Sequence, residues 1–295
     1  MKMPDGFDAR YCLPISWLCV IIVCAFLCSC ECVSVPKETK VNLLSIGLSY
    51  ERTNANSLGG TINDATEMHQ ALSKLYGPSL VSSQLLTDEQ ASKIAVLDML
   101  SSFPDAELNI LYFSGHGWTD GSLVLYADPI FLPSTELNAN CLLGVEELLD
   151  ALKSLQGKSL VILDSCYSGA FVKENGNGTS LVDEANPFDA VFAAYFSSRP
   201  YQASSYALSC TTADNTGKES RLWSHKHGYF TKALLDALGW DHQGNLSPPS
   251  QITLDGLYRT IKKTQAISLD GRRGQHPMVF QGTDNLVLYQ ANGNW

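Results

Sequence analysis

Blocks of two kinds alternate along residues 41–290. Short runs in which nearly every position is apolar are separated by longer stretches in which apolar residues recur three or four positions apart. The first pattern is typical of strands buried on both faces, and the second of amphipathic helices that cover a sheet. Their alternation predicts an α/β domain with a mostly parallel sheet. The expected strands are residues 41–49, 80–86, 108–113, 159–163 and 206–210, followed by one at 277–281 or 285–289.

Five helices are expected between and after these strands. In residues 63–75 the apolar positions keep helical spacing, and carboxylates near the start suit the positive end of the helix dipole. Thr87 is the expected N-cap of a helix that runs to about residue 100, because Gln90 follows it three residues later. The other helices are expected at residues 145–155, 229–238 and 254–267. Residues 118–133 are expected to form a hairpin or loop, and the turn-rich residues 170–204 a flexible connection.

Composition and charge narrow the classes of function. The chain has 295 residues with 45% apolar content, enough for one or two domains with a sizeable buried core. It carries 20 basic and 30 acidic residues, a net charge of −10, and no cluster of lysine or arginine interrupts that excess. Because an acidic surface repels phosphate backbones and attracts basic peptides, nucleic acid is excluded as an expected partner.

The N-terminus differs in composition from the rest of the chain. Six of the nine cysteines lie in the first 32 residues, in or beside the uncharged apolar run of residues 13–28. That run has the length of a signal-peptide core and is short for a membrane-spanning helix, so export is expected. The stretch ending at Cys30 resembles a bacterial lipobox, which makes Cys30 a candidate for lipidation. A lipoprotein, a cleaved soluble protein and a retained membrane anchor all stay open, with the bacterial cell envelope as the expected location.

Two motifs that carry chemistry each follow a predicted buried strand. The segment SGHG, with His116, leaves the strand at residues 108–113, and DSCYSG, with Cys166, leaves the strand at residues 159–163. Loops at the carboxyl ends of parallel strands gather on one edge of the sheet, so the two side chains are expected to be neighbours. A lone cysteine after an apolar strand is usually a small buried hydrophobe. The evidence for a catalytic role therefore comes from the cysteine and the histidine together.

A thiol beside an imidazole is a nucleophile with its base. A free thiol is only a few per cent thiolate at neutral pH, and an adjacent imidazolium stabilises the thiolate. The same imidazolium can later protonate a leaving amine. The backbone N–H groups of Gly117 and Cys166 are candidates for an oxyanion hole. Cysteine peptidase chemistry is therefore predicted from His116 and Cys166.

At these residues a family resemblance becomes specific. LYFSGHG and VILDSCYSG resemble the paired His and Cys motifs of the caspase-like (peptidase C14) domain, in its metacaspase and bacterial orthocaspase branch. SLGGTIND, YALSCTTADNTGKES and GYFTKALLDALG extend the resemblance over about residues 41–240, with weaker support to residue 282. It implies a three-layer fold with a sheet of about six strands, and endopeptidase activity through an acyl-enzyme.

The N-terminal apolar run and the family resemblance together predict an organisation of the chain. Residues 1–36 would hold the targeting segment or anchor with its linker, and residues 37–290 the peptidase domain. Within that domain a p20-like part covers about residues 41–172, a loop residues 173–204, and a p10-like part about residues 205–290.

Members of this branch cut after Arg or Lys, at the residue before the scissile bond (P1). Their acidic S1 pocket maps onto Asp64, Ser114 and Asp164, all present here. Two carboxylates near the nucleophile would pair well with a guanidinium, which is an independent reason to expect a basic P1 residue. Each carboxylate also has a structural alternative that is compatible with this role. Asp64 could serve a helix N-terminus, and Asp164 could cap the end of its strand.

Several features depart from the family or stay open. Thr61 stands where many metacaspases have a second cysteine. Calcium dependence is doubtful, because the nearest acidic residues fit a solvated loop better than a calcium site, and no metal or cofactor is expected. Those residues are Asp183, Glu184 and Asp189. The candidates for autoprocessing are Lys173, Lys218 and Arg221.

Other functions are compatible with the same residues. A non-catalytic caspase-like scaffold or regulator would be favoured by loss of either dyad residue, and both are present. A thiol transpeptidase would use the same dyad with a different acceptor. The remaining histidines have no paired nucleophile or ligand set and are interpreted as surface or satisfied core residues. They are His69, His225, His227, His242 and His276.

Overall fold

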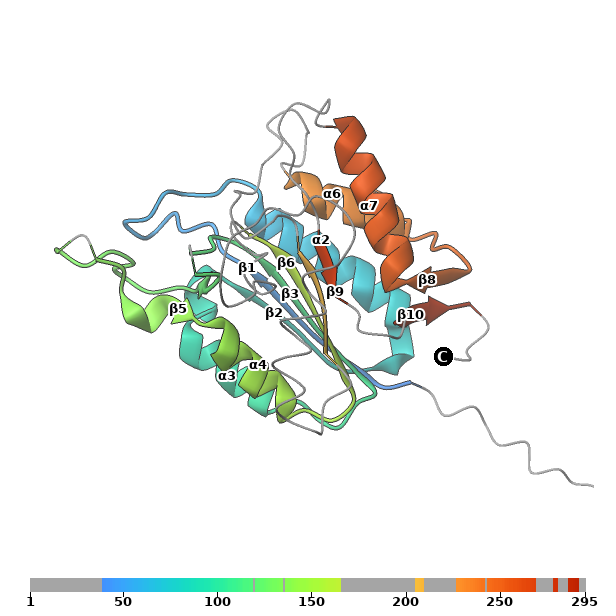
Figure 1. Cartoon of the computed structure of the whole chain (residues 1–295), viewed down its shortest axis with the longest axis horizontal. Coiled ribbons are helices and arrows are strands. Elements are labelled where there is room, and N and C mark those ends of the chain that lie inside the picture. The colour runs from blue at the N-terminus through green and yellow to red at the C-terminus, as the bar shows by residue number, and fades with distance from the viewer. Residues whose placement is uncertain are drawn as a thin grey trace, which may run out of the picture. The chain divides into compact units, whose positions relative to one another are not determined.

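A sheet of six strands in the order β2-β1-β3-β6-β7-β9 forms the centre of the fold (Figure 1). The computed structural model describes residues 39–118, 120–134, 136–165, 205–209, 227–241, 243–268, 278–280 and 286–291. The first five strands in that order are parallel, and β9 runs antiparallel to β7. The strands are β1 (Val41–Gly47), β2 (Leu80–Thr87), β3 (Leu108–Ser114), β6 (Lys158–Asp164), β7 (Ser205–Ser209) and β9 (Met278–Phe280).

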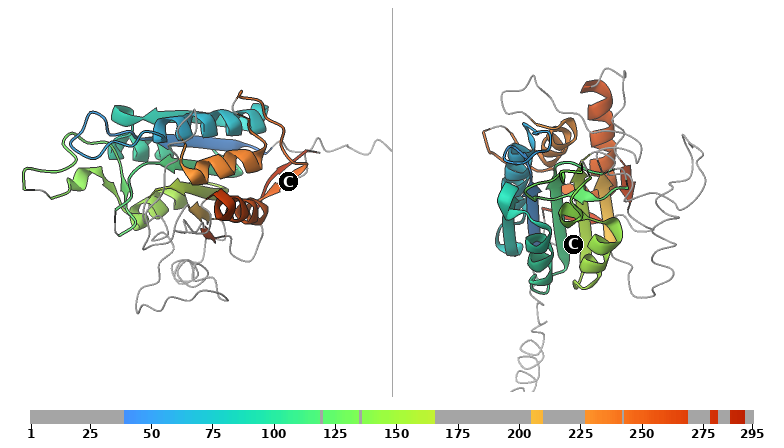
Figure 2. Two further views of the ribbon diagram at one scale, coloured as in Figure 1. Left: turned by 90° about the horizontal axis from the view of Figure 1, so that it is seen from above. Right: turned by 90° about the vertical axis from the view of Figure 1, so that its left-hand side faces the viewer.

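Helices cover both faces of this sheet (Figures 1 and 2). One face carries α2 (Thr61–Tyr76), α6 (Tyr229–Leu238) and α7 (Leu254–Ser268), and the other α3 (Lys93–Ser101) and α4 (Val145–Lys153). The prediction of a three-layer α/β fold with a mostly parallel, six-stranded sheet is confirmed.

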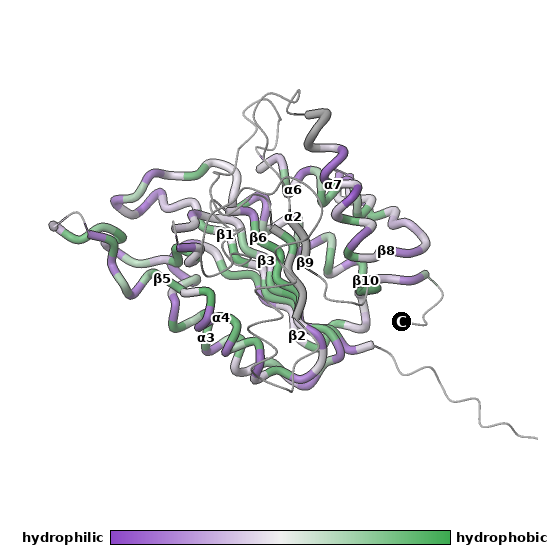
Figure 3. The backbone as a smooth tube through the Cα atoms, viewed as in Figure 1, coloured by the Kyte–Doolittle hydropathy of each residue, from purple (hydrophilic) through white to green (hydrophobic). Residues whose placement is uncertain are grey.

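The strand residues alternate between the two helical layers. Ile110 and Tyr112 of β3 point into the layer of α2 and α6, while Leu111 and Phe113 point into the layer of α3 and α4. Every residue of β1 and β3 is buried. These strands are apolar on both faces, which is why they form the hydrophobic centre of the backbone trace in Figure 3.

Two short antiparallel pairs lie outside the central sheet. β4 (Leu123–Val124) pairs with β5 (Leu142–Leu143), and β8 (Gln251–Thr253) pairs with β10 (Val287–Gln290). Both ranges considered for the last strand are therefore strands, but only β9 joins the central sheet. Three 3-10 turns complete the described elements, at Gly77–Ser79, Asp88–Gln90 and Ala139–Cys141.

The helix expected from Thr87 to about residue 100 is divided in two. Thr87 and Gln90 do form a capping box, but it closes only a 3-10 turn. Asp88 has a φ of +40°, and its carboxylate accepts two backbone N–H groups from the residues that follow β1. This tertiary contact holds the turn away from helical geometry. The helix α3 begins afresh after Ser92, whose hydroxyl caps it.

Several predictions fall on residues outside those that the structure describes, and they stay predictions. They concern the apolar run of residues 13–28, Cys30, the connection of residues 170–204, Lys173, Asp183, Glu184, Asp189, Lys218 and Arg221. Within the described ranges, no helix is long and apolar enough to span a membrane.

Candidate active site

The carboxyl ends of β3 and β6 place two of the predicted pocket residues side by side. Ser114 and Asp164 are the last residues of these strands and are partners in the parallel register. They follow Tyr112 and Ile162 by two positions, so both side chains point into the layer of α2 and α6. Asp64 lies in the first turn of α2. All three predicted pocket residues therefore meet on one face of one sheet edge.

Asp64 is bonded to three neighbouring residues. Its side chain is 3% exposed, and it accepts the Ser114 hydroxyl at 3.0 Å and the Gly228 N–H at 3.2 Å. Its Oδ1 also lies 2.7 Å from Nδ1 of His227. Burial raises the pKa of Asp64, although the hydrogen bond and the charge of His227 act in the opposite direction.

Asp164 is bound to the start of α6. Its Oδ2 accepts both the backbone N–H of Thr231 at 3.2 Å and the Thr231 hydroxyl at 2.6 Å. The N-cap residue of α6, Gly228, has no side chain to do this. Asp64 accepts the backbone N–H of Gly228 itself. The carboxylates of Asp64 and Asp164 therefore bind the amides at the start of α6 in place of an N-cap side chain. The structural alternative for Asp164 was a cap on its own strand, and the helix it caps is instead α6.

Gly228 lies between the two carboxylates. A Cβ at this position would lie 2.4 Å from Oδ2 of Asp164 and 3.3 Å from Oδ2 of Asp64. No side chain fits there without a shift of the surrounding atoms. The same distances show that both carboxylates face one point of the site.

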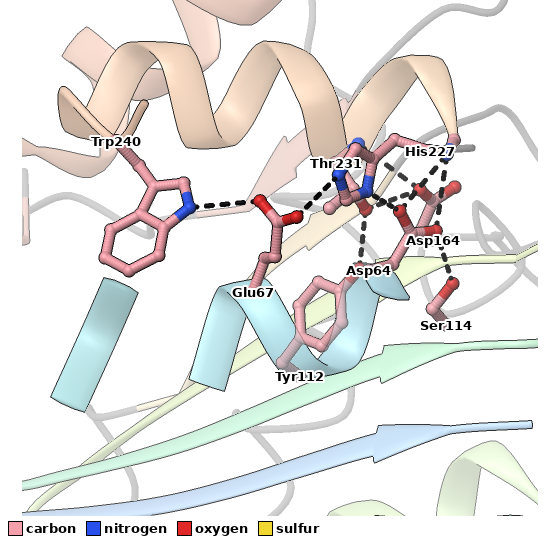
Figure 4. Close-up of polar contacts among 9 residues, drawn as sticks. Asp64, Glu67, Tyr112, Ser114, Asp164, His227, Thr231 and Trp240 are labelled. Carbon is pink, nitrogen blue, oxygen red and sulfur yellow. Dashed lines mark hydrogen bonds and ion pairs between the residues drawn. The ribbon is translucent and has the colours of Figure 1, made fainter. Parts of the chain in front are cut away.

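His227 links this cluster to a second acidic residue of α2 (Figure 4). Its Nε2 lies 3.3 Å from Oε1 of Glu67, and the other oxygen of Glu67 accepts the indole N–H of Trp240 at 3.0 Å. Burial alone would lower the pKa of His227, but the hydrogen bond and charge of Asp64, with the charge of Glu67, outweigh it and raise the pKa. His227 was interpreted from the sequence as a surface or satisfied core residue, and it is a buried, paired one.

Tyr112 completes the cluster from the sheet. Its hydroxyl is hydrogen-bonded to that of Thr231, which donates to Asp164, so the tyrosine is the donor in this chain of hydroxyls. Burial and the negative charges of Asp64 and Asp164 hold the pKa of Tyr112 well above its usual value. The tyrosine therefore stays neutral and supplies a proton donor to the acidic cluster.

The predicted base, His116, follows β3 by two residues and lies above the same sheet edge. Its ring nitrogen Nε2 is 2.7 Å from the backbone carbonyl of Asn56. Tyr50 packs against the ring, with ring centroids 4.6 Å apart, and its hydroxyl accepts the backbone N–H of His116 at 2.9 Å. Tyr50 is fully buried and has a φ of +60°, a conformation that a non-glycine residue adopts only at a cost. The ring of His116 is thus held from two sides.

Cys166, the predicted nucleophile, lies outside the described residues. Strand β6 is described up to Asp164, whose partner in the parallel register is Ser114. In the sequence, His116 follows Ser114 by two residues and Cys166 follows Asp164 by two.

Gly117 bridges to Leu123 as an isolated antiparallel pair. The two hydrogen bonds around this bridge use the N–H groups of Trp118 and Val124, at 2.8 and 3.0 Å. The N–H of Gly117 takes no part in them, which is the geometry of a non-hydrogen-bonded pair. This amide therefore keeps the freedom that an oxyanion-hole donor needs.

Within the residues that the structure describes, no group of three or more His, Cys, Asp or Glu side chains could hold a metal ion. Sequence reasoning did not identify several residues of the site, namely Tyr50, Asn56, Glu67, Tyr112, His227, Gly228, Thr231 and Trp240. Asn56 contributes only a backbone carbonyl, for which no sequence signal exists. His227 stands directly before the segment GYFTKALLDALG, and that position was the one available indication.

Comparison with known proteins gives a match to one protein family. The profile of the peptidase C14 family, described as the caspase domain, matches residues 43–282. No curated protein matches the chain. Among solved structures, protein GSU0716 from Geobacter sulfurreducens is similar at 14% identity with a TM-score of 0.48, over 84% of this chain and 93% of that one.

Proposed function

The chain belongs to the caspase domain family (peptidase C14), and from that premise we propose that it is a cysteine endopeptidase with Cys166 as nucleophile and His116 as base. The family is one of cysteine-type peptidases, whose substrates are proteins or peptides. The finer proposal is that this chain cleaves after Arg or Lys.

The observation that carries the proposal is the position of the His116 ring. A backbone carbonyl can only accept a hydrogen bond, so Nε2, which faces the carbonyl of Asn56, carries the hydrogen. In the neutral ring the other nitrogen, Nδ1, is then left as a proton acceptor. A histidine held in this tautomer is prepared to take the proton of a thiol that leaves the neighbouring strand end.

The proposed reaction has two steps. The thiol of Cys166 gives its proton to Nδ1 of His116, its sulfur forms a bond to the carbonyl carbon of the scissile peptide, and the amide N–H groups of Gly117 and Cys166 bind the resulting oxyanion. His116 then protonates the departing amine, which breaks the C–N bond and leaves an acyl-enzyme. Water, activated by the same histidine, releases the acid and regenerates the thiol.

The preference for a basic P1 residue is supported by the charge of the cluster. Asp64 and Asp164 face one point beside Gly228, and Glu67 lies next to them through His227. Among the described residues, His227 is the one cation paired with Asp64 or Glu67. Buried carboxylates in excess of cations are costly, and a guanidinium or ammonium from the substrate would offset that cost.

A peptide panel that differs only at P1 tests this function. The purified chain is expected to cleave peptides with Arg or Lys at P1 and to leave Asp peptides intact, and a Cys166→Ala variant is expected to cleave none. Product masses show whether water or an amine accepts the acyl group, and the intact mass of the enzyme reports autoprocessing. Cleavage that persists in a folded Cys166→Ala variant would disprove the assignment.

Tyr50 is expected to act on the rate through His116. Tyr50→Phe removes the hydroxyl that accepts the His116 N–H and that donates to the carbonyl of Val124. We expect kcat to fall about tenfold with little change in KM, and the free energy of unfolding to fall by about 1–2 kcal/mol. Steady-state kinetics and urea unfolding measure the two effects. Tyr126→Phe is the control, and equal kcat values for the Tyr50 and Tyr126 variants would refute the positioning role.

A further inference from the structure

The ring of His227 lies between two carboxylates of the same helix. Asp64 and Glu67 are three residues apart on α2, so they project from the same side of it. Oδ1 of Asp64 is 2.7 Å from Nδ1 of the ring, and Oε1 of Glu67 is 3.3 Å from Nε2. Both nitrogens face an acceptor, and only the doubly protonated ring can donate to both. In the neutral ring, one nitrogen lone pair would face a carboxylate oxygen.

Water offers little compensation at this position, because the side chain of His227 is 5% exposed. The titratable groups of the surrounding cluster come from three elements. Asp64 and Glu67 belong to α2, Asp164 ends β6, and Tyr112 of β3 stays neutral. On α6, which follows His227, Lys232 is paired with Asp236. The surroundings thus favour the proton on His227, in agreement with the raised pKa of its ring.

His227 is also connected to the point that Asp64 and Asp164 both face. His227 precedes Gly228, whose amide donates to Asp64 and where a Cβ would contact both Asp64 and Asp164. A cation that binds Asp64 from the substrate side would share that carboxylate with His227. The two positive charges would then lie on opposite sides of one buried carboxylate.

We propose that His227 is a positioning residue of the S1 pocket, which orients Asp64 and whose own proton competes with the basic P1 side chain for the charge of that carboxylate. The inference rests on the proposed preference for Arg or Lys. It makes His227 the residue that sets how strongly the pocket selects a cation at a given pH.

The direction of the pH effect follows from reciprocity. If loss of the proton from His227 strengthens binding of a P1 cation, then binding of that cation must promote loss of the proton. Affinity for an arginine peptide is therefore expected to rise as the pH increases through the raised pKa of His227, above its ordinary value of about 6.5. We expect a gain of about fivefold to tenfold. A neutral P1 side chain of the same shape should show no such gain.

Calorimetry on the full-length Cys166→Ala protein tests this without turnover. Two peptides are compared from pH 6 to pH 9, one with arginine at P1 and one with citrulline, its neutral isostere. Titration in buffers of different ionisation enthalpy measures the protons released on binding. Arginine stays charged over the whole range, so any titration belongs to the protein.

The expected result is release of a fraction of a proton with the arginine peptide and none with the citrulline peptide. His227→Gln should abolish the release and flatten the pH profile, because glutamine keeps one donor but does not titrate. His69→Gln is the matched control, since the ring of His69 contacts Ser83 of β2, and it should behave as the parent. NMR titration of the His227 ring, with and without the arginine peptide, measures the pKa of His227 directly. This second measurement does not depend on whether His227→Gln folds.

Three negative outcomes are distinguishable. If the arginine peptide binds with no proton release and the pKa of His227 is unchanged by it, the role of His227 is overturned and the preference for a basic P1 residue stands. If the arginine peptide binds no more tightly than the citrulline peptide at any pH, the preference itself fails, and with it this inference. A role of His227 in stability alone would lower the melting temperature of His227→Gln and leave its proton release equal to that of the parent.

Discussion

His116→Ala is expected to lower kcat for peptide cleavage by about 10³-fold while the protein stays folded. The imidazole is only half-buried, and among the described residues its ring makes one hydrogen bond, to the carbonyl of Asn56. Its loss removes the acceptor of the thiol proton and the donor to the leaving amine, but few buried polar groups are left unpaired. The rate should therefore fall far more than the stability.

Steady-state cleavage of an arginine peptide and circular dichroism check this expectation together. His69→Ala is the control, because it removes a histidine that contacts Ser83, in the middle of β2 and not at the carboxyl ends of the strands. An alanine variant at His116 that keeps more than about a tenth of the parent activity would exclude this residue as the base.

Two substitutions of Asp164 are expected to separate its two roles. Asp164→Asn keeps an oxygen that can accept from Thr231 but removes the charge, so kcat/KM for Arg and Lys peptides should fall about 10-fold to 100-fold. Cleavage of a citrulline peptide should change much less. Asp164→Ala in addition leaves the start of α6 without its acceptor. We expect it to lower the free energy of unfolding by about 2–4 kcal/mol, against about 1 kcal/mol for the asparagine.

Kinetics on the P1-varied panel and chemical denaturation measure the two effects separately. Asp98→Asn, on the exposed side of α3, serves as the control for loss of one negative charge from the protein. If Asp164→Asn kept the full selectivity for basic peptides, Asp164 would be a cap for α6 only, and Asp64 would have to carry the specificity.

The central strands were predictable because their sequence has one physical explanation. β3 and β6 are apolar on both faces, and each is followed at once by glycine-rich or small polar residues that end it. The position of the last strand was less predictable. The two candidate ranges for the last strand are both strands, and the choice between the central sheet and a separate pair depends on which partner each meets.

The start of α3 shows where local rules fail. Thr87 and Gln90 form the capping box that the sequence predicts, yet the helix begins six residues later. Asp88, between the two residues of that box, accepts hydrogen bonds from the backbone amides that follow β1. A local preference of about 1 kcal/mol is easily outweighed by two hydrogen bonds to a charged group.

By itself, the sequence determined that Ser114 and Asp164 end neighbouring strands at one edge, because parallel buried strands bring their carboxyl ends together. Only the tertiary structure decided what holds these residues. Asp64 meets His227 across 163 positions of the chain, and Asp164 meets Thr231 across 67. Contacts at such separations follow from the packing of α2 and α6 on the sheet, and they leave no period or spacing in the sequence that could predict them.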